Sequence, residues 1–146
     1  MIEFDNQTNL PINTTLLEEI AEVLTTQNVE LILTDDETIR QLNRKHRGKD
    51  QKTDVLSFPL ETPFIESSSF SLPLGSIVIA DSFVKENAEK FGHSIQHECS
   101  LLFIHGMLHL LGFDHETDHG EMREREKQLI EQFHLPESLI IRTEEE

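Results

Sequence analysis

Three histidines between residues 105 and 115 are the side chains best placed to do chemistry in this sequence. His105 and His109 are four positions apart, a spacing that puts both imidazoles on one face of an α-helix. Gly112 can end that helix with positive φ, so that the chain turns and brings His115 round to the other two. Three imidazoles with a fourth position open are typical of a catalytic zinc site, because structural zinc sites are closed by a fourth ligand.

The alternative is an ordinary core helix whose histidines hydrogen-bond to the backbone. The segment around them is strongly apolar, which predicts a buried helix. Buried imidazoles need partners, because an unpaired polar group in the interior costs free energy. The glycine stop and the third histidine together favour the metal site over this alternative.

A basic segment earlier in the chain is the second candidate. Six of the 12 Lys and Arg residues lie between Arg40 and Lys52, opposed there only by Asp50, in a chain of net charge −16. This local basic patch could bind an anion on an otherwise acidic body. Alternatively, the segment is a solvent-exposed helix end whose cations complement the helix dipole. The two interpretations are compatible with each other.

The elements that must position these residues alternate along the chain. Apolar runs predict strands at residues 1–7, 29–33, 53–59 and 74–80, with helices between them and a helix that starts at Ser94 and carries the first two histidines. Residues 60–73, rich in Pro and Ser, predict a loop. The pattern predicts an α/β or α+β domain, in which helices pack on a small, mostly parallel mixed sheet of about four strands.

Length and composition restrict the class of protein further. The chain of 146 residues predicts one domain, 1–146, with residues 140–146 as a disordered acidic tail. A lone cysteine, Cys99, excludes an internal disulfide and predicts a buried thiol in a reducing compartment. Neither a signal peptide nor a membrane span is visible, so we expect a cytoplasmic protein without membrane contact.

The histidine segment and three others resemble the YbeY family of bacterial endoribonucleases, also called rRNA maturation factors or metal-dependent hydrolases. The resemblance covers most of the chain, from about residue 28 to residue 133, and includes Met122 and Glu126 of the last helix. Its motifs are LNRKHRGKD (residues 42–50), TDVLSFP (53–59), LGSIVI (74–79) and HGMLHLLGFDH (105–115).

The resemblance implies a zincin-like fold and one zinc ion per chain, bound by His105, His109 and His115. It also implies that Arg47 is catalytic and contacts the substrate phosphate, with Arg44 and Lys49 as further candidates for substrate binding. The implied activity is zinc-dependent, single-strand-specific endoribonuclease cleavage in 16S rRNA 3′-end maturation and ribosome quality control. The implied partners are precursor rRNA and ribosomal or ribosome-assembly proteins.

Two positions depart from the family pattern. Ser76 stands where the family usually has an acid, which puts any hydrogen bond of that acid in doubt. Phe113 stands where the residue before the third ligand is commonly Tyr, so a hydroxyl is missing.

Two other functions compete with the nuclease. The ligand spacing equals that of metzincin peptidases, but Gly106 occupies the position of their general base, a Glu. A zinc-stabilised assembly factor without enzyme activity is the other alternative, because an acidic body suits a basic ribosomal protein. For the nuclease, the sequence leaves open whether water bound to zinc or the RNA 2′-OH attacks the phosphate, and it shows no clear general base.

Overall fold

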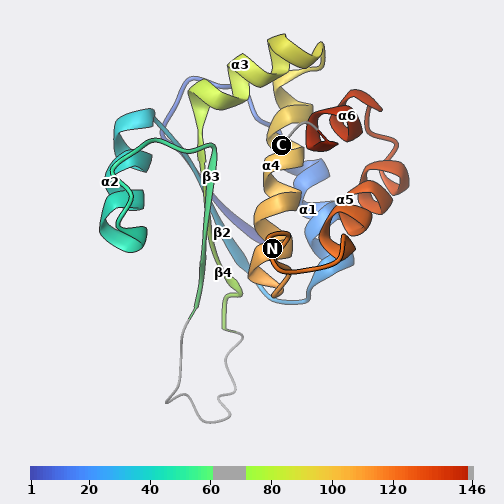
Figure 1. Cartoon of the computed structure of the whole chain (residues 1–146), viewed down its shortest axis with the longest axis horizontal. Helices are drawn as coiled ribbons and strands as arrows, with labels where there is room; N and C mark the ends of the chain where they lie inside the picture. Colours follow the sequence, from blue (N-terminus) through green and yellow to red (C-terminus); the bar gives the residue numbers. More distant parts are fainter. Residues whose placement is uncertain (61–71, 145–146) are drawn as a thin grey trace.

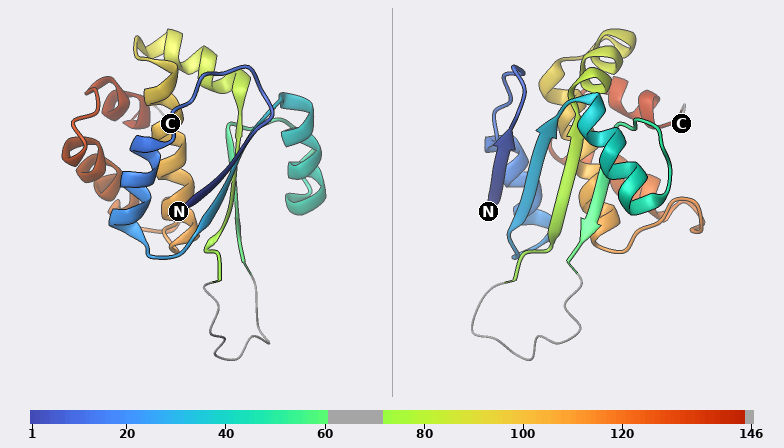
Figure 2. Two further views of the ribbon diagram at one scale, coloured as in Figure 1. Left: turned by 180° about the vertical axis from the view of Figure 1, so that it is seen from behind. Right: turned by 90° about the vertical axis from the view of Figure 1, so that its left-hand side faces the viewer.

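The computed structural model describes residues 1–60 and 72–144, and its strands form one twisted sheet (Figure 2). The order of the strands across the sheet is β1 (Ile2–Asn6), β2 (Val29–Thr34), β4 (Gly75–Ala80), β3 (Val55–Pro59). The β1–β2 and β2–β4 pairs are parallel, whereas β3 is antiparallel to β4. The predicted mixed, mostly parallel sheet is therefore confirmed.

Helices cover the two faces of the sheet unequally (Figure 1). Among the described helices, α2 (Asp36–Arg47) alone covers one face, over a small cluster that includes Ile39 and Val78. The other face packs against α4 (Ile95–Leu110), and the remaining helices surround α4 or lie at the end of the sheet. These are α1 (Thr15–Leu24), α3 (Asp81–Phe91), α5 (Glu121–Gln132) and α6 (Ser138–Glu144).

Helix α4 is the central element because it is apolar on nearly all sides. It begins as the sequence predicts, with the Ser94 side chain accepting a hydrogen bond from the His97 amide. It ends at Leu110, and Gly112 follows with φ of 97°, in the left-handed region that glycine tolerates. The predicted helix and its glycine stop are both confirmed, and Cys99 is buried on it as expected.

Gly106 lets α4 approach the sheet closely. A Cβ atom built at this position would lie 2.8 Å from Cγ2 of Ile77, a buried β4 side chain. Real Cβ atoms essentially never approach so closely, and the branched Ile77 side chain has little freedom to move away. Glycine at 106 is therefore a requirement of the packing between α4 and β4.

The C-terminal segment corrects one prediction. Residues 140–144, expected within a disordered tail, belong to α6, and Arg142 there is only 5% exposed. The reason is that Arg142 forms ion pairs with Glu98 and Asp54, which hold this segment against the rest of the domain. The acidic residues that follow Arg142 give no sign of these pairs in the sequence. Residues 145–146 and most of the predicted loop (61–71) lie outside the described residues.

A membrane-spanning helix is absent from the described residues, in which every helix is too short or too polar to span a bilayer.

Candidate metal centre

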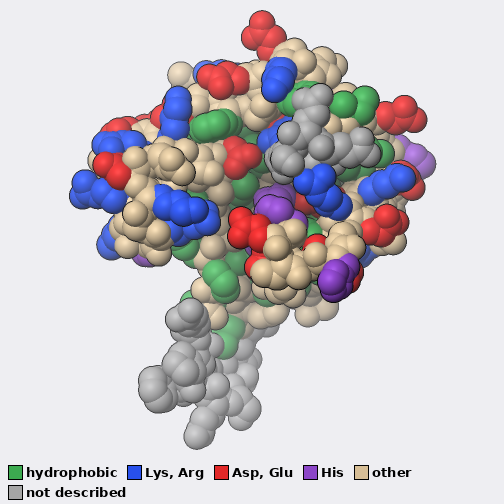
Figure 3. Space-filling model, in the orientation of Figure 1, with side chains coloured by type: hydrophobic (Ala, Val, Ile, Leu, Met, Phe, Trp, Pro, Cys, Tyr) green, Lys and Arg blue, Asp and Glu red, His purple; other side chains and the backbone are tan. Residues whose placement is uncertain are grey.

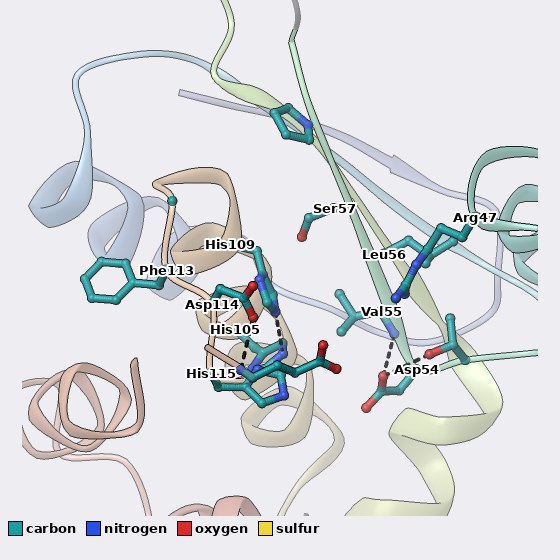
Figure 4. A pocket seen from close by; sticks show the side chains of 14 residues that line it. Arg47, Asp54, Val55, Leu56, Ser57, His105, His109, Phe113, Asp114 and His115 are labelled. Atoms are coloured by element: carbon teal, nitrogen blue, oxygen red, sulfur yellow. Dashed lines mark hydrogen bonds between the residues drawn. The ribbon is translucent and has the colours of Figure 1, made fainter. Parts of the chain in front are cut away.

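The three predicted histidines meet beside β3, the strand at one edge of the sheet. His105 and His109 project from α4 and His115 from the turn after it, and their potential ligand nitrogens all lie within 4.8 Å of one another (Figure 4). The Nε2 atoms of His105 and His109 are 3.1 Å apart. Nitrogens bound to one tetrahedral zinc lie roughly 3.4 Å apart, so this spacing suits a single metal ion. Three imidazoles so placed can hold a metal ion, and among the described residues this is the one such cluster.

Glu126 orients the first of these imidazoles. Its Oε1 lies 2.7 Å from Nδ1 of His105, and its side chain is only 4% exposed. The bond fixes the ring so that Nε2, on the opposite side, faces the other histidines. A carboxylate behind a ligand histidine is a common way to set the tautomer and raise ligand basicity.

His109 lies in surroundings that favour its neutral form. Burial lowers the pKa of its imidazole below the usual value, and the neighbouring His105 and His115 lower it further. A lowered pKa keeps the ring neutral at neutral pH, and a neutral ring is the form that binds metal.

A cleft of about 560 Å³ opens in front of the histidines. One wall is made by His105, His109 and the turn that carries His115. The other is made by Arg47, at the end of α2, and by residues 53–57 at the start of β3 (Figure 4). The structure thus brings Arg47 to the same cavity as the three histidines, although Arg47 precedes His105 by 58 positions in the sequence.

The rest of the basic segment divides into two groups. Arg40 pairs with Glu37 and Asp50, and Lys52 pairs with Asp36, so these two cations stabilise the helix and its exit. The cations toward the C-terminal end of α2 are exposed and form no ion pair among the described residues: Arg44, Lys45, Arg47 and Lys49. Arg47 is the one of these four cations that lines the cleft, as far as the described residues show. Lys and Arg side chains gather over α2 on the left of Figure 3.

Sequence reasoning missed the contacts of three side chains in or behind the walls of the cleft. Ser57 donates a hydrogen bond to the Gly106 carbonyl at 3.1 Å and so ties β3 to α4 across the floor of the cleft. Asp54 lines the cleft, but its partner Arg142 is 88 positions away. Glu126 offered a usable signal, because it shares the buried face of its helix with Met122 and Leu129, where an acid is unexpected.

Of the two departures from the family pattern, Ser76 lies outside the cleft, whereas Phe113 is one of the residues that line it. Ser76 donates a hydrogen bond to Glu30 at 2.7 Å, beside it in the sheet, and is not a cleft-lining residue. The Phe113 ring points away from the histidines and packs on the core (Figure 4). Asp114 accepts a hydrogen bond from the Glu116 amide at 3.0 Å and so caps the turn that carries His115.

Comparisons with known proteins agree with this architecture. A family model described as endoribonuclease YbeY matches residues 2–134. A protein named endoribonuclease YbeY from Sulfurovum is 59% identical over 99% of this chain and 98% of its own length. The protein of the same name from Helicobacter pylori is 54% identical over 99% of this chain and 100% of its own.

A solved structure shows the same fold. The solution structure of a Thermotoga maritima protein aligns with a TM-score of 0.57 and 31% identity, covering 91% of this chain and 89% of that one. The match of the family model over most of the chain, together with the full-length relatives, identifies the family. The chain belongs to the endoribonuclease YbeY family.

Proposed function

We propose that this protein is a zinc-dependent endoribonuclease that cleaves single-stranded precursor rRNA during 16S rRNA 3′-end maturation and ribosome quality control in the cytoplasm. The single observation that carries the proposal is the shared cleft, in which a three-histidine centre faces the Arg47 guanidinium. A metal site opposite a fixed cation suits a phosphodiester, whose charge grows on the way to the transition state.

The proposed roles follow from chemistry and position. His105, His109 and His115 would hold the metal, and a bound zinc ion would supply Lewis-acid chemistry at a phosphate oxygen. Glu126 would keep the His105 ring in place. Arg47 would hold and neutralise the phosphate, since a guanidinium matches two phosphate oxygens at once.

Arg44 and Lys49 would act at a distance from the reaction. Both are exposed beside Arg47 but do not line the cleft, so we assign them to the attraction of flanking phosphates. The negative charge of the rest of the protein would repel RNA elsewhere and favour approach over α2.

Peptidase activity is a weaker alternative for a structural reason. A metzincin-like base would need a Glu at position 106, where even a Cβ atom would meet Ile77 at 2.8 Å. Its absence therefore reflects the way α4 packs on β4.

A non-enzymatic assembly factor is the second candidate, favoured by the net charge of −16, which suits a basic ribosomal protein. Cleavage of 3′-extended precursor rRNA by purified protein decides between the two, with a chelator, zinc add-back and His105→Ala as controls. The nuclease predicts cleavage that stops with chelator and returns with zinc. Cleavage that survives both the chelator and His105→Ala would come from a contaminant and would leave the assembly factor as the better reading.

A further inference from the structure

A chain of buried polar contacts runs from α6 to the wall of the cleft. The Arg142 guanidinium donates from Nε to Glu98 Oε2 at 2.9 Å and from Nη2 to Asp54 Oδ2 at 3.2 Å. The other oxygen of Glu98 lies 2.7 Å from Nε2 of His93, whose Nδ1 lies 2.9 Å from the Ser138 hydroxyl. Helix α6 is therefore anchored near its start and near its end by polar contacts to the interior.

Because these groups are buried, each of their charges needs a partner. The side chains of Glu98, His93 and Arg142 are 0%, 1% and 5% exposed, whereas that of Asp54 is 28% exposed at the cleft. A charge leaves water at an acceptable cost only when it is paired and hydrogen-bonded. Arg142 supplies that pairing to two carboxylates at once, one in the core and one at the surface of the cleft.

Asp54 connects this network to the site. Its Oδ1 accepts a hydrogen bond from the Val55 amide at 2.8 Å, and its carbonyl accepts one from the Ala80 amide at 2.9 Å. Asp54 thus fixes the start of β3, the strand whose residues form the wall opposite the histidines (Figure 4). Its carboxylate is also a negative charge on the wall of a cleft that would receive a phosphodiester.

We infer that Arg142 is a positioning residue for substrate binding: acting through Asp54, it fixes the β3 wall and offsets the carboxylate charge that would otherwise repel the RNA phosphate. This inference rests on the proposed function. Arg142 lies beyond residues 2–134, so the role belongs to a segment outside the match to the family model.

The experiment separates charge from shape with four variants of the full chain. Arg142→Met removes the guanidinium, Arg142→Lys keeps the charge, Asp54→Asn removes the carboxylate charge, and Arg142→Met/Asp54→Asn removes both. Arg125→Met, which removes the same type of side chain from α5 outside the cleft, is the matched control. Steady-state cleavage of a single-stranded RNA gives KM and kcat, and zinc content is measured on each protein.

Arg142→Met is expected to raise KM about tenfold, the factor for losing one charge interaction near the substrate, with a smaller change in kcat and normal zinc content. Arg142→Lys should fall between this variant and the wild type. In the double variant KM should return most of the way to the wild-type value, because the uncompensated charge is gone. Unchanged KM in folded Arg142→Met, or a double variant no better than that single one, overturns the inference.

A second readout does not depend on cleavage. In amide hydrogen exchange, Arg142→Met should accelerate exchange at Val55, while Leu102 in the middle of α4 stays protected. If the wild type cleaves no RNA, the proposed function fails, but exchange at Val55 still decides whether Arg142 positions the wall. If Arg142→Met does not fold, the same exchange measured in Arg142→Lys and Asp54→Asn decides it, and wild-type protection of Val55 in both overturns the inference.

Discussion

The two walls of the cleft are built in opposite ways. The metal wall comes from one stretch of eleven residues, 105–115, and its histidines are set by helical spacing and one glycine turn. The substrate wall combines α2, β3 and, through Arg142, α6. Its key cation, Arg47, is exposed, whereas His105 and His109 are half-buried. The metal wall is thus built from neighbours in the sequence, and the substrate wall depends on contacts between distant segments.

Removing a ligand from the metal wall should have the largest effect. His109→Ala should lose the metal and lower cleavage by roughly three orders of magnitude or more, since a catalytic metal supplies several kcal/mol of transition-state stabilisation. Metal analysis and the rRNA cleavage assay measure both losses. His119→Ala, which changes an exposed histidine outside the cluster, is the control and should behave as wild type. Retention of both metal and activity in His109→Ala would rule out the proposed centre.

Removing the cation of the substrate wall should lower cleavage without affecting metal binding. Arg47→Ala should keep full metal content but lower kcat/KM by about 10²–10³-fold, the scale found for one preorganised group at a reacting centre. Lys49→Ala is the matched control and should cost less than about tenfold while reducing the salt dependence of binding, as expected of a flanking phosphate contact. Equal effects of the two substitutions would contradict the special position of Arg47 in the cleft.

The support of the metal wall should be measurable apart from the ligands. Glu126→Gln should weaken zinc binding by about 10–100-fold, because it replaces the carboxylate that orients His105 with a weaker acceptor. Competition with a zinc chelator of known affinity measures the change. The control is Glu124→Gln, which makes the same change at an exposed position two residues earlier on α5. Wild-type affinity in Glu126→Gln would show that the 2.7 Å contact does not influence the metal.

The close packing of α4 on β4 behind the metal wall predicts that a larger residue at position 106 destabilises the fold. Gly106→Ala should lower the free energy of unfolding by about 1–3 kcal/mol, the usual cost of overpacking a core. Thermal or denaturant unfolding measures it. The cost should shrink in an Ile77→Ala background, because that substitution removes the atoms which the new methyl group would meet. An equal cost in both backgrounds would locate the strain elsewhere.

The smallest effect concerns Cys99, six residues before His105 on the buried part of α4. Burial, with a smaller contribution from the neighbouring Glu98, raises the pKa of this thiol from 9.0 to about 12. Since the raised value leaves almost no thiolate at pH 8, iodoacetamide should label Cys99 only after denaturation, as mass spectrometry can show. Comparable labelling of the native protein would mean that the core behind the histidines opens readily.

Some of this organisation is encoded locally. The spacing of His105 and His109 and the glycine stop depend on helical periodicity and on positive φ, so neighbours in sequence suffice to predict them. The four strands were predictable for the same reason, from short apolar runs. The tail was not, because the acids that end it suggest a solvated segment while Arg142 takes part in an interior ion pair.

The sequence by itself determined the spacing of the three histidines, the glycine at 106 and the segment that holds the cations. Only the tertiary structure decided which of those cations faces the histidines, why position 106 must be glycine, and which charges support the site. The physical reason is the range of the interactions: Glu126 reaches His105 across 21 positions and Arg142 reaches Asp54 across 88. Pairings at such separations follow from packing of the whole domain and leave little local pattern in the chain.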